Sequence, residues 1–127
     1  MGLTFDFFVD TNVLIYIMDG HPHPKVSSMA KFSLGVSVIT EIELLGTKNI
    51  TSHKETTIRT LLNNCEIIDF NETIKDITIS LKQKYSIKTP DAIIAATAKA
   101  LNLPLITADK GFKKIEDIEV VLLDLNC

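Results

Sequence analysis

The chain has 127 residues, a hydrophobic fraction of 46% and a formal net charge of −3 at pH 7. This length fits one domain, residues 1–127, with a core of its own. No apolar run approaches the roughly 18 residues of a membrane span. The acidic balance is unlike the basic character of most domains that bind polyanions through overall charge. We therefore expect one soluble domain that does not enter a membrane.

The N-terminus and the cysteines favour the cytoplasm. A secretory signal needs a basic start and a small-residue cleavage site, and the N-terminus has neither. Asp6 and Asp10 also interrupt its apolar stretch. Cys65 and Cys127 are far apart and have no neighbours at metal-ligand spacing. We expect both to be reduced thiols of a cytoplasmic protein.

Strand-like and helical patterns alternate along the chain. A helical pattern near residues 12–18 is apolar all round, which predicts that it is covered on more than one side. Ser52 with Glu55 forms a capping box, Asn71 caps a longer helical pattern, and Pro90 opens another. Alternation of this kind predicts a mostly parallel sheet. The expected strands are residues 5–9, 35–39, 66–69, 104–107 and 120–123.

Four acidic residues stand at junctions between these elements. Asp10 and Asp109 follow apolar strands, Glu41 follows a strand and the capping-type Thr40, and Asp91 opens a helix. In an open α/β sheet, ligands bind outside the carboxyl ends of the strands. We expect these acids to gather at that edge.

Each acid also has a simpler explanation. Glu41 and Asp91 lie in first helical turns, where the helix dipole alone favours an acid. Asp10 and Asp109 could be turn residues that bind nearby backbone N–H groups. Two helices between the third and fourth strands would also start the Asp91 helix at the opposite edge, unless one of them runs across the sheet. Spacing alone therefore does not place Asp91 in the site.

Clustered carboxylates repel one another unless a cation compensates their charge. All-oxygen ligands suit Mg²⁺ or Mn²⁺ better than zinc. Such ions activate water for attack on a phosphodiester, so the pattern indicates nucleic-acid hydrolysis. Lys110, Lys113 and Lys114, just after Asp109, could contact phosphates or simply form a solvated face.

Four segments in order resemble the conserved blocks of PIN-domain ribonucleases, and most closely those of the VapC-type toxins of toxin–antitoxin pairs. These segments are residues 9–16 (VDTNVLIY), 37–44 (SVITEIEL), 90–96 (PDAIIAA) and 105–109 (LITAD). The resemblance covers nearly the whole chain.

The resemblance implies a three-layer α/β/α fold around a parallel five-stranded sheet. It also implies RNA as the substrate, a homodimer, and a cognate antitoxin that inserts a segment near the site. By the same resemblance, the metal-binding and catalytic residues around Mg²⁺ or Mn²⁺ are Asp10, Glu41, Asp91 and Asp109. Thr11, Asn12 and Thr107 match positions that support the acids by hydrogen bonds.

Gly111 departs from the pattern, because many relatives have a further acid there. That difference leaves open a weakly held second metal ion. It also leaves open a non-catalytic PIN-like module that acts through protein or RNA binding. An RNA-processing nuclease without an antitoxin is a further alternative. A phosphatase with Asp10 as nucleophile is disfavoured, since Asn12 stands where that mechanism needs a second aspartate.

Two other features receive no role in the site. His21 and His23 alternate with prolines, which indicates an extended loop without a third metal ligand. Glu43 lies two positions after Glu41, so on a helix it is expected to face elsewhere, to hold a basic partner or to assist from the flank.

Overall fold

The computed structural model describes residues 4–125. Cys127, and with it the prediction of a reduced thiol there, lies outside the described residues. Cys65 is a free, partly buried thiol. None of the helices within residues 4–125 has the length and apolarity to cross a bilayer.

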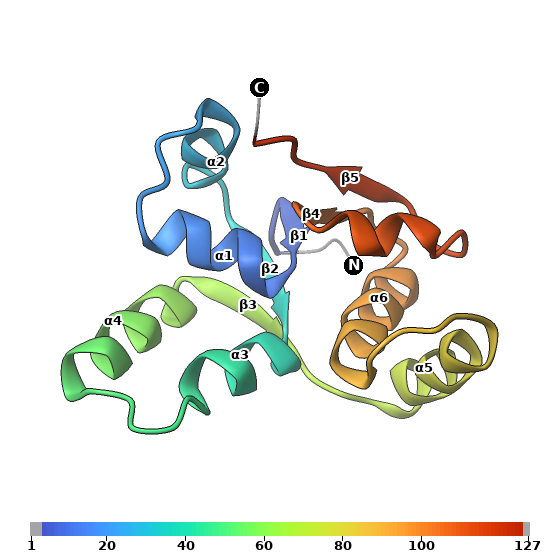
Figure 1. Ribbon diagram of the computed structural model, residues 1–127. Helices are drawn as coiled ribbons and strands as arrows, with labels where there is room; N and C mark the ends of the chain where they lie inside the picture. The colour runs from blue at the N-terminus through green and yellow to red at the C-terminus, as the bar shows by residue number, and fades with distance from the viewer. Residues whose placement is uncertain (1–3, 126–127) are drawn as a thin grey trace.

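The predicted parallel five-stranded sheet is confirmed, in the order β3-β2-β1-β4-β5 (Figure 1). Every neighbouring pair is parallel. Strand β1 lies in the middle, where Phe8 pairs with Gly35 on one side and with Leu105 on the other. The strands are β1 (Phe7–Val9), β2 (Leu34–Ser37), β3 (Cys65–Ile68), β4 (Leu105–Thr107) and β5 (Val120–Leu122).

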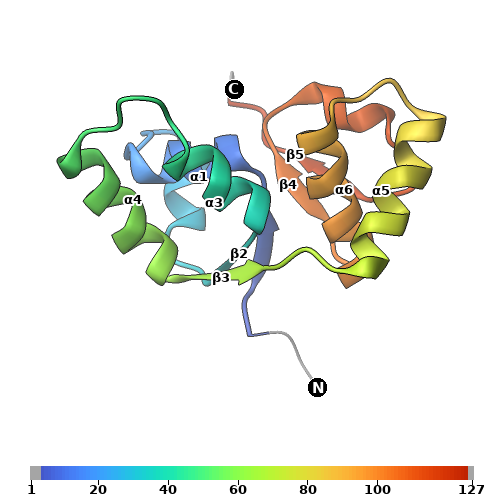
Figure 2. The ribbon, with the colours of Figure 1, turned by 90° about the horizontal axis from the view of Figure 1, so that it is seen from below.

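Helices cover both faces of the sheet, which makes the fold the expected three layers (Figure 2). Strand residues alternate between two cores: Phe8 and Leu105 belong to one, Val9 and Ile106 to the other. The first core lies against α5 (Glu72–Lys84) and α6 (Thr89–Leu101). The second lies against α1 (Thr11–Met18), α2 (Pro24–Met29), α3 (Val38–Leu45) and α4 (Ser52–Asn63). A 3₁₀ helix, η1 (Lys110–Lys114), follows β4.

Helix α2 is absent from the sequence prediction, which placed a loop around the prolines. Pro24 occupies the first helical turn, where its missing N–H costs nothing. His23 caps the helix, and its Nδ1 accepts a hydrogen bond from the Lys25 N–H at 3.1 Å. Histidine is not among the usual capping residues, so the signal was missed.

Strand β2 ends two residues earlier than expected, because Ser37 and not Thr40 caps the following helix. The Ser37 Oγ accepts a hydrogen bond from the Ile39 N–H at 3.0 Å, and α3 begins at Val38. Thr40 is instead fully buried inside the helix.

The uncertainty about the Asp91 helix is resolved by the path of the chain between β3 and β4. Helices α5 and α6 pack side by side and run in opposite directions (Figure 2). The segment that connects them, residues 85–88, lies beside Asp109, at the carboxyl ends of the strands. Helix α6 therefore starts at the same edge as the ends of β1 and β4.

Candidate active site

A small cavity of about 40 Å³ lies where β1 and β4 end and α6 begins. We call it the carboxylate cavity. Three of the four predicted acids line it, Asp10, Asp91 and Asp109, and a glutamate from α3 joins them. The complete lining is Asp10, Thr11, Asn12, Glu43, Asp91, Ile94, Asp109 and Phe112.

Asp10 is the most buried acid of the cavity, with only 3% of its surface exposed. Its Oδ1 accepts a hydrogen bond from the Val13 N–H at 2.9 Å and so caps α1. Its Oδ2 accepts one from the Thr107 hydroxyl. Burial raises the pKa of the Asp10 carboxyl; the two hydrogen bonds oppose this rise, and the charges of Asp109 and Asp91 add to it. The protein holds this carboxylate rigidly, in a place unfavourable for a lone negative charge.

Asp91 and Asp109 are more accessible. Asp91 lies in the first turn of α6, partly buried. Burial raises the pKa of Asp91, the charges of Asp109 and Glu43 raise it further, and Lys88 and Lys114 lower it. Asp109 caps η1, since its Oδ1 accepts a hydrogen bond from the Gly111 N–H at 2.8 Å. The charge of Asp109 thus raises the pKa of both Asp10 and Asp91, as expected of a site that is completed by a cation.

Glu41, expected as the fourth acid, does not line the cavity, and Glu43 does. The two residues lie about 200° apart around α3, on opposite sides of the helix. The side with Glu43 faces α1: the Thr11 hydroxyl donates to Glu43 Oε1 at 2.7 Å and lies 2.9 Å from the Thr40 hydroxyl. The sequence-based choice of Glu41 rested on its position after a strand and on the resemblance to PIN-domain ribonucleases. The contact with Thr11 that places Glu43 at the cavity joins residues 32 apart in the sequence.

The three predicted supporting residues lie at the cavity in different ways. Thr107, fully buried, links two acids: its hydroxyl donates to Asp10 and accepts the Asp109 N–H at 2.9 Å. Thr11 contacts Glu43 instead of an aspartate. Asn12 lines the cavity, with no side-chain hydrogen bond among residues 4–125.

The donor set fits a hard divalent cation, because all four charged groups at the cavity are carboxylates. Within residues 4–125, no three His, Cys, Asp or Glu side chains stand close enough to enclose an ion. His21 and His23 do not form a metal site with a third residue in this range either. The Nδ1 of His21 instead accepts a hydrogen bond from the His23 N–H at 3.1 Å. The carboxylates thus line a common space without closing around it.

Two larger cavities flank the carboxylate cavity. The first, the apolar groove, has about 550 Å³ and shares Thr11 and Glu43 with it. Its walls come from α1, α3, α4 and the segment before α4, and include Ile15, Met18, Leu44, Ile50, Lys54 and Ile58. The second, the lysine pocket, has about 250 Å³ and shares Asp91, Asp109 and Phe112. Its walls also include Ser86, Ile87, Lys88, Gly111 and Lys114.

Comparison with known proteins agrees with this arrangement. The family model described as PIN domain matches residues 7–118. A toxin–antitoxin complex from Klebsiella pneumoniae is similar at 32% identity, with a TM-score of 0.75, covering 93% of this chain and 100% of that one. VapBC2 from Rickettsia felis, bound to a DNA fragment from its promoter, is similar at 25% identity, with a TM-score of 0.77 and coverage of 93% and 98%. FitAcB from Neisseria gonorrhoeae has 25% identity, a TM-score of 0.74 and coverage of 91% and 96%. No curated protein sequence matches the chain.

Fold and cavity together define a parallel α/β domain with acids at the carboxyl edge of its sheet. The match over residues 7–118 identifies it further: the chain belongs to the PIN domain family. The resemblance to VapC-type toxins noted in the sequence is supported by VapBC complexes among its structural relatives. PIN-domain proteins of this kind are nucleases, and they generally use a divalent metal ion.

Proposed function

We propose that the chain is a metal-dependent endoribonuclease that hydrolyses RNA phosphodiester bonds and is the toxin of a toxin–antitoxin pair. The observation that carries this proposal is the carboxylate cavity. Four acids from separate parts of the chain line about 40 Å³ of space, and each of the two whose pKa is raised interacts with other acids of the set. Such mutual repulsion is unfavourable for a structural site and useful for holding a cation.

In this proposal, Asp10, Asp91, Asp109 and Glu43 hold Mg²⁺ or Mn²⁺. Glu43 takes the place that the sequence interpretation gave to Glu41. When bound, the ion activates a water molecule and stabilises negative charge on the phosphodiester oxygens. The chain keeps the acids in position: Thr107 and the Val13 N–H fix both oxygens of Asp10, and Thr11 fixes Glu43. Because Gly111 adds no fifth carboxylate to the set, this proposal includes one firmly held ion.

The antitoxin partner is supported by the relatives and by the apolar groove. The Klebsiella and Rickettsia relatives are toxin–antitoxin complexes. The groove is mostly apolar and meets the carboxylate cavity at Thr11 and Glu43. An antitoxin segment with apolar side chains, bound there, would end beside the acids and block access to them. A reading frame for a small DNA-binding protein next to the gene would support the pair over a processing nuclease.

We also propose that the protein acts in the cytoplasm as a homodimer. A soluble RNA substrate and an antitoxin partner support this compartment. The homodimer is the assembly that the resemblance to VapC-type toxins implies. Light scattering of the purified chain would test this. A monomer at micromolar concentration contradicts it.

The test of the proposed activity is cleavage of a mixed transfer and ribosomal RNA pool by the purified chain. The reactions contain Mg²⁺, Mn²⁺ or a chelator and are repeated with Asp91→Asn. Asp76→Asn is the matched control, because Asp76 is an exposed acid of α5 outside all three cavities. We expect metal-dependent cleavage that is lost only in Asp91→Asn.

A folded chain that cuts nothing under any of these conditions would contradict the nuclease. The alternative is then a non-catalytic module that acts by binding protein or RNA. Calorimetric titration with Mn²⁺ separates the two: the nuclease should show binding that Asp10→Asn suppresses. A non-catalytic module without a metal site should show none.

A further inference from the structure

The lysine pocket opens directly beside the carboxylate cavity. Asp91, Asp109 and Phe112 line both spaces, so the two cavities adjoin at these side chains. At about 250 Å³ the pocket is much larger than the carboxylate cavity, which measures about 40 Å³. The geometry therefore leaves room for part of a substrate next to the place where its bond is cut.

Two ammonium groups distinguish this pocket from the rest of the site. Lys88 precedes α6, and Lys114 ends η1. Both line the lysine pocket together with Asp91 and Asp109, so their ammonium groups lie next to two of the carboxylates. This arrangement suits a phosphodiester chain: one phosphate can meet the metal ion at the carboxylates, and the next can meet the ammonium groups of the lysine pocket.

Both lysines have donors left for a ligand. The Lys114 Nζ donates to the Ser86 carbonyl at 2.6 Å, which occupies one of its three N–H bonds. The side chain of Lys88 makes no hydrogen bond or ion pair with any residue in the range 4–125. An exposed lysine in a cavity beside four acids is thus available for a phosphate oxygen.

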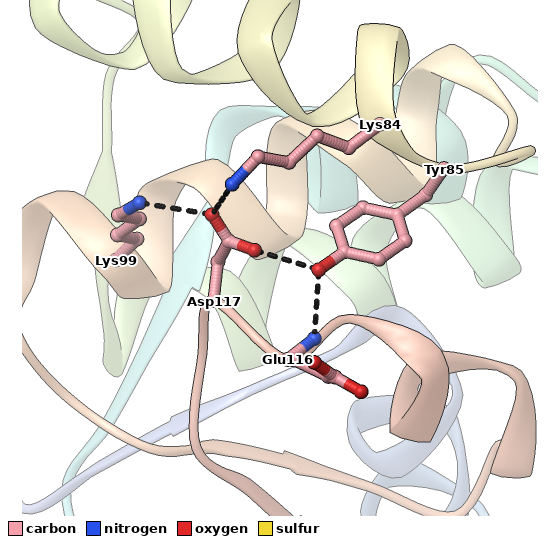
Figure 3. Close-up of polar contacts among 5 residues, drawn as sticks. All are labelled: Lys84, Tyr85, Lys99, Glu116 and Asp117. Carbon is pink, nitrogen blue, oxygen red and sulfur yellow. Dashed lines mark hydrogen bonds and ion pairs between the residues drawn. The ribbon is translucent and has the colours of Figure 1, made fainter.

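The walls of the pocket are tied together before any ligand arrives. Figure 3 shows Asp117, which comes after η1, accepting bonds from three side chains of α5, its C-cap and α6. The Tyr85 hydroxyl donates to Oδ1 at 2.7 Å, and Lys84 and Lys99 donate to Oδ2 at 3.0 and 3.2 Å. The Glu116 N–H donates back to the Tyr85 oxygen at 3.2 Å.

This network and the Lys114–Ser86 bond hold residues 85–88 against residues 110–117 at two places. These two segments carry Lys88 and Lys114. Because the two walls are fixed, a ligand does not have to organise them when it binds, and less binding energy is lost.

We propose that the lysine pocket is a subsite for RNA, in which Lys88 and Lys114 bind the backbone phosphate next to the one that is cut. The inference rests on the proposed ribonuclease function and adds positioning residues to it. Lys113, on the same 3₁₀ helix, is outside the pocket, and Lys110 lines a different cavity. Of the three lysines after Asp109, the subsite therefore uses only Lys114.

The test compares Lys88→Ala and Lys114→Ala with the wild type in cleavage of the transfer RNA pool over a range of salt concentrations. Each variant should raise the apparent KM about fivefold or more and change kcat less. Each should also reduce the steepness of log(kcat/KM) against log[salt] by about 1, the change expected when one phosphate contact is lost. Lys88→Arg should restore both values, because it keeps the charge.

Two controls separate a phosphate contact from a structural effect. Lys113→Ala removes a neighbouring charge of η1, and Lys75→Ala removes an exposed charge of α5. Neither residue lines the pocket, so both variants should keep the wild-type salt slope. Since Lys114→Ala also removes the bond to Ser86, the decision rests on Lys88 and its rescue by arginine.

Direct binding makes the result independent of cleavage. The probe is a short, fluorescein-labelled single-stranded RNA of mixed sequence, titrated by anisotropy against Asp10→Asn with and without Lys88→Ala. Weaker binding with a smaller salt slope supports the subsite. An unchanged salt slope overturns it, even if the wild type cuts RNA. Absence of cleavage by the wild type overturns the proposed function, and the anisotropy result then still decides whether the pocket binds RNA.

Discussion

The two cavities beside the acids differ in the ligand that each can hold. The apolar groove, between α1, α3 and α4, has aliphatic walls, whereas the lysine pocket, between the α5–α6 connection and η1, has two ammonium groups. The groove shares Glu43 with the carboxylate cavity, and the pocket shares Asp91 and Asp109. If the proposed antitoxin and the proposed RNA use these two cavities, each reaches the acids past a different part of the lining.

Asp10→Asn should abolish catalysis whichever of the two flanking cavities a ligand uses. Asp10 lines the carboxylate cavity itself and neither the groove nor the lysine pocket. We expect RNA cleavage to fall by more than the roughly 100-fold upper value seen when a residue behind a metal ligand is lost. In chelator at neutral pH, its melting temperature should be equal to or above that of the wild type.

The stability gain follows from the raised pKa of Asp10. Ionised Asp10 is disfavoured in the fold, so its cost is fully present above the folded pKa and disappears as the pH falls below the ordinary value of 3.8. Asparagine remains a good helix cap, so α1 should be preserved. Thermal melts at neutral pH and at about pH 3 measure the change. A variant that is inactive because it is unfolded would contradict the prediction.

Glu43→Gln and Glu41→Gln form a matched pair on the groove side. Glu43 lines the carboxylate cavity and Glu41 does not. Glu43→Gln should reduce cleavage about 10–100-fold, while Glu41→Gln should stay within about twofold of the wild type. Initial rates with Mg²⁺ and with Mn²⁺ measure both variants. The reverse order of effects would restore Glu41 to the site.

Met18→Glu tests the groove as the antitoxin side. Met18 is partly exposed on the groove wall, and a buried carboxylate opposite an apolar segment is costly. The variant should bind the antitoxin at least about tenfold more weakly than the wild type does. The measurement is the concentration of added antitoxin that halves the rate of RNA cleavage by each toxin. Ser80→Glu, which makes the same change from a neutral to an acidic side chain at an exposed position of α5 outside the groove, is the control. Equal inhibition of both variants would place the partner elsewhere.

Asp117→Asn should loosen the walls of the lysine pocket, because Asp117 accepts bonds from Lys84, Tyr85 and Lys99. The bonds from Tyr85, Lys84 and Lys99 hold the pKa of Asp117 well below its usual range. The stability from ionised Asp117 is therefore fully present above about pH 4 and is lost as the pH falls towards its folded pKa. The variant should melt a few degrees below the wild type at neutral pH, and the gap should narrow in acid.

Glu119→Gln is the control for this last variant, since Glu119 is an exposed acid of the same segment whose side chain has no hydrogen bond or ion pair among residues 4–125. A gap between Asp117→Asn and the wild type that does not change with pH would mean that the charge of Asp117 contributes nothing.

The strands were predictable from the sequence because their signal is local. Apolar runs such as residues 5–9 and 104–107 end at Asp10 and close to Asp109, and parallel strands bring their carboxyl ends to one edge. The placement of these two aspartates followed directly. The resemblance to PIN-domain ribonucleases added the order of the segments.

The position of Glu43 was not predictable from local pattern, because it depends on which side of α3 packs against α1. Thr40 is buried against Thr11 of α1, 29 residues away in the sequence, and Glu43 contacts the same threonine. Asp91 likewise depends on the direction of α5, which is set by its contacts with α6 and the sheet. Propensity and spacing do not contain such long-range information.

The central place of β1 in the sheet affects when the site can form during synthesis of the chain. The first strand of the chain pairs with β4, and the hydrogen bond from Thr107 to Asp10 closes a separation of 97 residues. Long-range pairings of this kind form late in folding. A nascent chain that has not yet reached residue 105 contains Asp10 but neither the strand nor the threonine that fixes it. A copy that stops short of β4 therefore cannot assemble these acids, and the site exists only once synthesis has passed Asp109.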